Sequence, residues 1–221
     1  MLLIALDFGA LYTIYPTMKR QYFWRERIRG RGLRNRCAQH HCLLTARSNR
    51  AELRLLLAER GIELVYGAGN VGLMGVLADA ALQANGRVIG VIPEALMAKE
   101  VGHSGLTELR IVKSMHERKA LMADLSDGFI AMPGGFGTFE EFCEVVTWSQ
   151  LGIHAKPCGL LNVNGYYDPL LALFDRAVRE GFLREENRQM VLEDRDPARL
   201  LEKMAQFRAP AVDKWISGNE R

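Results

Sequence analysis

From residue 51 onward, the hydrophobic positions switch repeatedly between a helical period and short apolar runs. Apolar residues at helical spacing predict helices over 51–60, 73–85, 114–127, 138–151, 170–182 and 197–207. The short apolar runs predict strands over 62–67, 87–93, 107–113, 128–134 and 156–163, and an edge strand over 189–194. Strands that alternate with helices in this way are typical of βαβ units. The pattern therefore predicts an α/β fold: one Rossmann-like domain with a doubly wound parallel sheet.

The first 48 residues do not join this alternation. The opening run "MLLIALDFGALYTIY" predicts a buried strand rather than a signal or an anchor, because Asp7 interrupts it and no basic residue precedes it. The run is also shorter than the roughly 20 residues that a membrane span needs. We interpret residues 1–48 as an atypical segment from a misassigned start or a reading-frame shift. Residues 49–208 are then the folded domain, and residues 209–221 are a C-terminal tail.

Positive charge is concentrated in that N-terminal segment. The chain of 221 residues has a net charge of +3, and residues 18–36 hold eight Lys or Arg side chains but a single glutamate. The rest of the chain is therefore acidic. Such a stretch either binds nucleic acid or a membrane surface, or is a solvated arm that is foreign to the fold. We favour the second interpretation and expect neither nucleic acid nor a membrane as a partner.

The cysteines and histidines indicate neither disulfides nor a metal. The four cysteines are too few and too scattered for a disulfide framework, so we expect a cytoplasmic protein. Cys37, His40, His41 and Cys42 lie close together, but their spacing fits no standard zinc site. We therefore expect no metal and no cofactor.

The stretch "GAGNVGLMG", Gly67 to Gly75, links a predicted strand to a predicted helix. Such a loop lets the backbone approach a phosphate at the positive end of the helix. No acidic residue for a ribose follows the next strand in the dinucleotide-binding manner, and no P-loop lysine is present. The loop is equally consistent with a tight turn. The candidate substrate-binding residues in it are Gly69, Asn70, Gly72 and Met74.

A second glycine-rich stretch, "PGGFGTFEE", is more specific. Gly134, Gly135 and Gly137 follow a strand and leave amides that can form a nest for an anion. Thr138 and Glu141 have two interpretations at this point. They form either a capping box that only closes the helix, or a hydroxyl and a catalytic carboxylate beside the anion.

The stretch "SMHERK" favours the catalytic interpretation. It begins a predicted helix, with Ser114 as N-cap, and places His116, Arg118 and Lys119 near the ligand end of the sheet. Basic residues at a helix N-terminus oppose the macrodipole, and this conflict indicates an anionic ligand. Cations, anion-binding glycines and a carboxylate suit a sugar phosphate whose bond breaks through a cationic transition state.

These motifs, with "LVYGAGNVGLMG" and "GLLNVNGYYDPLL", resemble those of the LOG ("lonely guy") family of cytokinin riboside 5′-monophosphate phosphoribohydrolases. The resemblance runs from about residue 51 to 201 and makes residues 49–208 a LOG-type domain. It implies a homodimeric hydrolase that releases free base and ribose 5-phosphate from a nucleoside 5′-monophosphate. Members have often been labelled lysine decarboxylases, but nothing here looks like a lysine that would hold pyridoxal phosphate.

The resemblance also implies roles for individual residues. Arg118 and Glu141 would be the catalytic pair. The nucleotide site would be lined by Lys119, Gly135, Phe136, Gly137, Thr138, Phe139 and Glu140, with further substrate contacts from Glu100 and Thr147. Departure of the base leaves an oxocarbenium-like sugar that a carboxylate stabilises, so no metal or cofactor is required.

The chain departs from the family pattern at two places. The N-terminal Cys-Gly-Ser loop that usually faces the nucleotide is absent, and Ala68 stands where a third glycine is common. The base remains open: an adenine with an isoprenoid N6 group, plain AMP or another purine nucleotide. One alternative is a non-catalytic carrier of the same fold, such as a molybdenum-cofactor carrier. Another is a nucleic-acid binder that uses the basic arm.

Overall fold

The computed structural model describes residues 3–7, 52–53, 56–57, 59–69, 73–97, 103 and 105–210, and of residues 3–7 and Leu73 only the backbone. The arginine-rich stretch and the Cys37–Cys42 cluster lie outside these residues. Within them, no helix is long and apolar enough to cross a bilayer.

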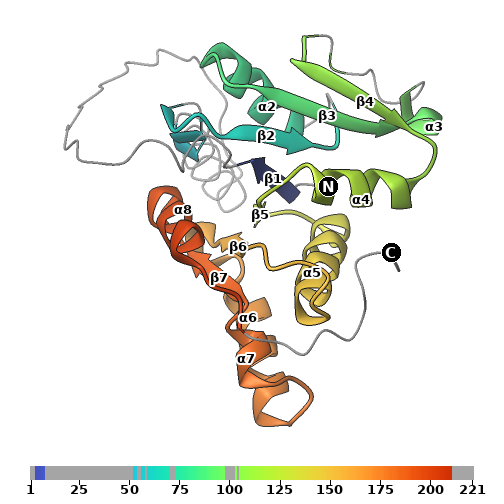
Figure 1. The fold of residues 1–221 in the computed structure, drawn as a ribbon. Coiled ribbons are helices and arrows are strands. Elements are labelled where there is room, and N and C mark those ends of the chain that lie inside the picture. Colours follow the sequence, from blue (N-terminus) through green and yellow to red (C-terminus); the bar gives the residue numbers. More distant parts are fainter. Residues whose placement is uncertain are drawn as a thin grey trace, which may run out of the picture.

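Among the described residues, seven strands form one sheet in the order β4-β3-β2-β1-β5-β6-β7 (Figure 1). Their bounds are Leu3–Asp7 (β1), Glu63–Tyr66 (β2), Val88–Pro93 (β3), Glu108–Val112 (β4), Gly128–Ala131 (β5), Cys158–Leu161 (β6) and Val191–Asp194 (β7). The strands β2, β3 and β4 pair in parallel, and so do β5, β6 and β7. The predicted fold class is confirmed, and β7 lies at an edge as predicted.

The central strand β1 is the exception to the parallel arrangement. It pairs antiparallel with β2 on one side and with β5 on the other. A strand offers N–H and C=O groups on both edges, and its hydrophobic pattern carries no information about direction. The predicted strand at the start of the chain is thus present and integrated into the sheet, with a direction that differs from that of the other six.

Helices cover both faces of the sheet (Figure 1). Their bounds are Leu73–Gln83 (α2), Glu94–Met97 (α3), Met115–Asp124 (α4), Phe136–Gln150 (α5), Asp168–Arg179 (α6), Glu185–Arg188 (α7) and Pro197–Gln206 (α8), with a 3-10 turn at Val163–Gly165. One core cluster joins α2 and α8 to one face, with Leu77, Leu200 and Met204 among its members. The other joins α4, α5 and α6 to the opposite face, around Phe129 and Phe142.

The predicted helices and strands are present among the described residues. The helix predicted over 51–60 is helical at residues 52–53, 56–57 and 59, and α8 begins with Pro197 as predicted. The four-residue helices α3 and α7 were not predicted, because four residues are too few to show a helical period. The helix α5 begins at Phe136, two residues earlier than predicted.

The strand order places a topological switch point at the middle of the sheet. The chain leaves the edge strand β4, passes through α4 and returns as β5, beyond β2 and β1. Ligands of open α/β sheets bind outside the carboxyl ends of the strands at such a point. The carboxyl ends of β2 and β5, and the helices α4 and α5, therefore surround the expected site.

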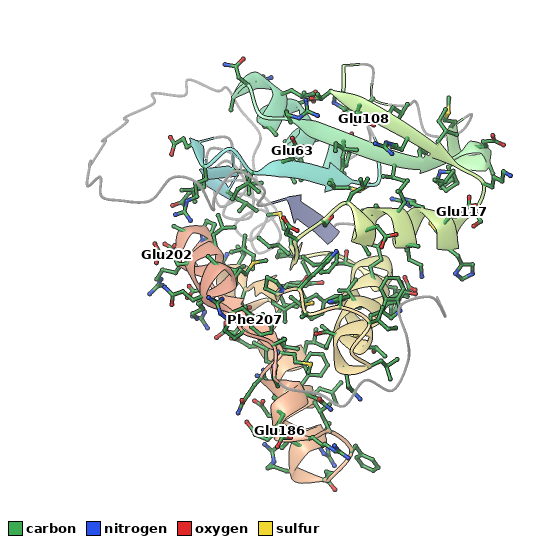
Figure 2. The ribbon with its side chains drawn as sticks, viewed as in Figure 1. Glu63, Glu108, Glu117, Glu186, Glu202 and Phe207 are labelled. Carbon is green, nitrogen blue, oxygen red and sulfur yellow. The ribbon has the colours of Figure 1, made fainter. Side chains whose placement is uncertain are left out.

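Ser114 fixes the start of α4, as predicted. Its Oγ accepts a hydrogen bond from the backbone N–H of Glu117 at 3.1 Å. In return, Glu117 Oε2 accepts one from the N–H of Lys113 at 2.6 Å, and Glu117 lies at the exposed end of the helix (Figure 2). This reciprocal arrangement is close to a capping box, and it satisfies donors that the first helical turn leaves without partners.

We expect Ser114→Ala to lower the free energy of unfolding by about 1 kcal/mol, because the cap acceptor is lost. Ser114→Asp is the matched control and should retain most of the stability, since aspartate caps equally well. Urea unfolding followed by circular dichroism measures both variants. Equal midpoints for the wild type and Ser114→Ala would contradict the capping role.

Candidate active site

The glycine-rich loop "PGGFGT" leads from β5 directly into α5. The N-cap of α5 is Gly135, with no side-chain cap, and the N–H groups of Thr138 and Phe139 donate to the Gly135 carbonyl at 3.0 and 3.2 Å. Thr138 therefore lies inside the first turn. The capping-box interpretation of Thr138 and Glu141 is wrong, because the helix begins before Thr138.

The start of α5 retains the features of an anion site. Gly135, Phe136 and Gly137 are exposed, and Phe136 is 92% exposed. The first amides of a helix have no acceptor within it and carry the positive end of the dipole. Thr138 is buried against Gly134, where a Cβ would overlap its hydroxyl. The loop can thus present backbone N–H groups to a phosphate at the switch point.

Glu141 lies one turn further along α5 and is buried, with 3% of its surface exposed. Burial raises the pKa of Glu141 to about 7, and the positive charge of Arg118 opposes this rise. A carboxyl group of this kind exchanges a proton close to neutral pH. Its position and its proton affinity both suit acid–base chemistry.

Arg118 reaches the same region from α4. It is 4% exposed, and its Nη1 lies 3.3 Å from Met115 Sδ. Its guanidinium packs against Gly67, the residue that follows β2, so closely that a Cβ on Gly67 would lie 2.6 Å from Arg118 Cζ. Arg118 therefore lies at the carboxyl end of β2, where it acts electrostatically on Glu141 beyond β5.

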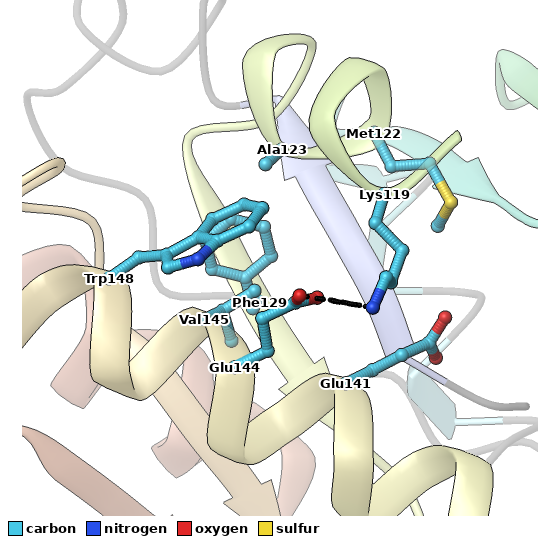
Figure 3. Close-up of a pocket in the computed structure, with 8 residues that line it drawn as sticks. All are labelled: Lys119, Met122, Ala123, Phe129, Glu141, Glu144, Val145 and Trp148. Atoms are coloured by element: carbon cyan, nitrogen blue, oxygen red, sulfur yellow. Dashed lines mark hydrogen bonds and ion pairs between the residues drawn. The ribbon is translucent and has the colours of Figure 1, made fainter. Parts of the chain in front are cut away.

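Lys119 follows Arg118 but has a different environment. Its Nζ donates to Glu140 Oε1 at 2.7 Å and to Glu144 Oε1 at 3.0 Å. Desolvation alone would lower the pKa of Lys119, but these hydrogen bonds raise it above its usual value. Figure 3 shows Lys119 and Glu144 pointing toward one another, with Glu141 extending from the preceding turn of α5. Lys119 thus ties α4 to α5 through two carboxylates.

A small pocket lies beside these charges. Its polar lining is Lys119, Glu141 and Glu144, and the apolar part of its lining includes Phe129 and Trp148 (Figure 3). The pocket lies between α4 and α5, on the face of the sheet that those helices cover. Phe129 and Val145 in its lining also belong to the core cluster of that face.

Two tyrosines that the sequence motifs did not single out form hydrogen bonds with the glycine-rich loop and the residue before it. The hydroxyl of Tyr167 is buried and donates to the Met132 carbonyl at 2.6 Å, and Tyr166 donates to the Gly134 carbonyl. Phe139 stacks on Tyr166, with ring centroids 6.4 Å apart. Both tyrosines belong to the quoted stretch "GLLNVNGYYDPLL", so a signal was present. Only the fold shows that this stretch contacts the glycine-rich loop.

Other predicted site residues lie elsewhere or outside the described residues. Met74 is partly buried against the core in α2. Gly69 follows the end of β2, as expected. Thr147 is exposed, donates to the Cys143 carbonyl at 2.7 Å, and lines a groove with Phe174 rather than the pocket of Glu141. Glu100, Asn70 and Gly72 lie outside the described residues.

Ala68 and His116 also have definite positions. Ala68 is buried and has a φ of 56°, a left-handed conformation that glycine adopts more readily. This explains physically why glycine suits the position. His116 is exposed at the start of α4 and is not part of the buried pair.

Within the described part of the chain, no group of three or more His, Cys, Asp or Glu side chains is arranged to hold a metal ion. What the site offers is the exposed backbone at the start of α5, a buried guanidinium and a buried carboxyl group whose pKa burial raises to about 7. Together these groups can bind an anion and stabilise positive charge that develops beside it.

Residues 74–204 match the family model described as "possible lysine decarboxylase". A probable cytokinin riboside 5′-monophosphate phosphoribohydrolase of Oryza sativa subsp. japonica is 57% identical over 151 residues, which are 68% of this chain and 68% of that protein. The cytokinin riboside 5′-monophosphate phosphoribohydrolase LOG of the same plant is 51% identical over 156 residues (71% and 64%). A bacterial enzyme of that name, from Rhodococcoides fascians, is 56% identical over 141 residues (63% and 71%).

Two solved structures have a similar fold at low identity. The molybdenum cofactor binding protein of Rippkaea orientalis superposes with a TM-score of 0.54 at 22% identity, over 73% of this chain and 87% of that one. The molybdenum cofactor carrier protein of Chlamydomonas reinhardtii gives a TM-score of 0.51 at 21% identity, over 76% and 88%. These likenesses support the Rossmann-like fold.

We expect Tyr167→Phe to lower the free energy of unfolding by about 1–3 kcal/mol, because the buried Met132 carbonyl loses its hydrogen bond. Tyr166→Phe is the matched comparison. Tyr166 is 39% exposed, so water can replace its hydroxyl and the loss should be smaller. Thermal or urea unfolding measures both. A larger loss for Tyr166→Phe would contradict this ranking.

Proposed function

This chain belongs to the LOG family of phosphoribohydrolases, and we propose that it hydrolyses the N-glycosidic bond of a nucleoside 5′-monophosphate. The products are the free base and ribose 5-phosphate. The observation that supports this reaction best is the buried Arg118–Glu141 pair at the switch point, next to the open start of α5.

The binding step uses the backbone more than side chains. The phosphate binds the amides at the start of α5, where the helix dipole and the exposed Gly135 and Gly137 favour an anion. Arg118 adds a full positive charge from α4. Lys119 is held by Glu140 and Glu144, so a phosphate would have to compete with both carboxylates for its ammonium group.

The chemical step uses the carboxylate of Glu141. As the base departs, positive charge develops on the ribose ring, and a carboxylate held nearby stabilises it. The same carboxylate orients the attacking water and takes its proton, which a pKa of about 7 allows near neutral pH. Arg118 keeps a useful fraction of Glu141 ionised, because its charge opposes the effect of burial.

A carrier of the same fold is the alternative from another class. Carriers need an anion nest but have no use for a carboxylate beside it. In this chain Glu141 is buried at the site and paired electrostatically with Arg118. A buried carboxylate repels an anionic ligand, so its presence favours the hydrolase.

The partners and the base are further parts of the proposal. We propose a homodimer located in the cytoplasm, with a nucleoside monophosphate as the only ligand that the reaction requires. Light scattering coupled to gel filtration measures the oligomeric state directly. Adenine with an isoprenoid N6 group is the leading candidate base, because the relatives named above are cytokinin riboside phosphoribohydrolases.

We expect the purified protein to release free base from isopentenyladenosine monophosphate, AMP or both, and Glu141→Gln to lower kcat/KM by about 10²–10⁴. The amide has nearly the same shape but can neither carry the charge nor accept the proton. Chromatography of the free base measures the rate. Glu180→Gln, an isosteric change at the exposed end of α6, is the control and should leave the rate unchanged.

Two other outcomes are informative. Equal rates for Glu141→Gln and the wild type would refute the catalytic role. Tight nucleotide binding without release of base would favour the carrier.

We expect kcat/KM to fall on the acid side with a midpoint near pH 7, because burial raises the pKa of Glu141 to about 7 and protonation removes the active carboxylate. An ordinary glutamate would place this midpoint at about pH 4.3. The substrate phosphate titrates near pH 6 as well. Its contribution is measured from the pH dependence of inhibition by ribose 5-phosphate, which carries the same group. A flat profile between about pH 5 and 8 would contradict the assignment.

A further inference from the structure

We propose that Gly67 is a positioning residue for Arg118: the missing side chain at the end of β2 leaves the space in which the guanidinium docks. The inference rests on the proposed function, since it concerns the same site. It gives the "GAGNVG" loop a role that differs from phosphate binding. The glycine-rich pattern predicted substrate contacts in this loop, and Gly67 itself was not among the predicted site residues.

The contact between the two residues is direct. A Cβ built on Gly67 would overlap Arg118 Nη2 and would lie 2.6 Å from Cζ and 3.2 Å from Nε. All three of the atoms nearest to that Cβ belong to Arg118. The guanidinium therefore occupies the volume that any other amino acid at position 67 would fill.

Backbone conformation does not by itself require glycine at this position. Gly67 is not among the residues with positive φ, whereas Ala68, the next residue, has a φ of 56°. An alanine at position 67 would therefore be compatible with the local backbone. The steric conflict would fall on the far end of a flexible side chain, so the guanidinium would move and the strand would stay.

The guanidinium of Arg118 is enclosed, so a displacement would change its contacts. Arg118 is 4% exposed, and its Nη1 contacts Met115 Sδ. A displaced guanidinium loses its place against β2 and changes its distance from Glu141. Since the charge of Arg118 lowers the pKa of Glu141, a change in that distance would shift the pKa of Glu141.

A double-mutant cycle tests the steric step. We expect Gly67→Ala to lower kcat/KM by roughly tenfold or more, as expected for a misplaced catalytic group. In the Arg118→Ala background the added methyl has nothing to displace, so Gly67→Ala should change the rate by less than about twofold. Equal losses in both backgrounds would overturn the proposal.

Gly159→Ala is the matched control. A Cβ there would lie 3.0 Å from Leu200 Cδ1 and 3.2 Å from Met204 Sδ, on the opposite core cluster. It should affect stability, measured by thermal unfolding, and combine additively with Arg118→Ala. Thermal unfolding of Gly67→Ala confirms in the same experiment that the variant is folded at the assay temperature.

A titration that needs no activity tests the electrostatic step. Carbon-13 NMR of side-chain-labelled glutamate follows the carboxyl group of Glu141, with Glu141→Gln to assign the signal. We expect a midpoint in Gly67→Ala that differs from that of the wild type, and no change in Gly159→Ala. An unchanged midpoint in Gly67→Ala would overturn the positioning role. If the wild type releases no base from any nucleotide, the proposed function fails, while this titration still decides the role of Gly67.

Discussion

The structure depends most on the burial of two opposite charges, those of Arg118 and Glu141, between helices that follow different halves of the sheet. Moving a charge out of water costs roughly several kcal/mol, and a buried pair seldom recovers this fully. Burial of these charges therefore costs stability, and the surrounding elements fix where both groups lie. Gly67 makes room for the guanidinium, Ser114 fixes the start of α4, and Tyr167 supports the loop before α5.

Two similar sequence patterns illustrate how far sequence reasoning reaches. "SMHE" and "TFEE" both place a hydroxyl residue three positions before a glutamate. Ser114 is a true N-cap, whereas Gly135 caps α5 and leaves Glu141 free for chemistry. Local spacing could not separate these cases, because glycine is also an acceptable N-cap. The first residue of α5 depends on how the loop after β5 packs, which the spacing of the motif does not show.

The same limit explains which parts of the fold and the site could be predicted. Periodicity identifies the helices and strands because burial of one face repeats along the chain. It cannot give the direction of β1, since the strand pattern is the same in both directions. The motif resemblance nominated Arg118 and Glu141 as candidates, whereas the contacts of Gly67 and Tyr167 are made across the fold. Glu141 and Thr147 both lie on α5, but they line different cavities. The sequence motifs alone do not show this difference.

The fold is shared with proteins that bind molybdenum cofactor, so the fold itself does not distinguish a carrier from an enzyme. A carrier and an enzyme of this fold must therefore differ in side chains that catalysis needs and ligand binding does not. An anion site would bind better without a buried carboxylate, because the carboxylate repels the ligand and is itself costly to desolvate. In this chain the carboxylate of Glu141 is retained, enclosed and opposed by one guanidinium, so that its protonation is balanced near neutral pH. That balance suits the proposed reaction, in which positive charge develops on the ribose as the N-glycosidic bond breaks.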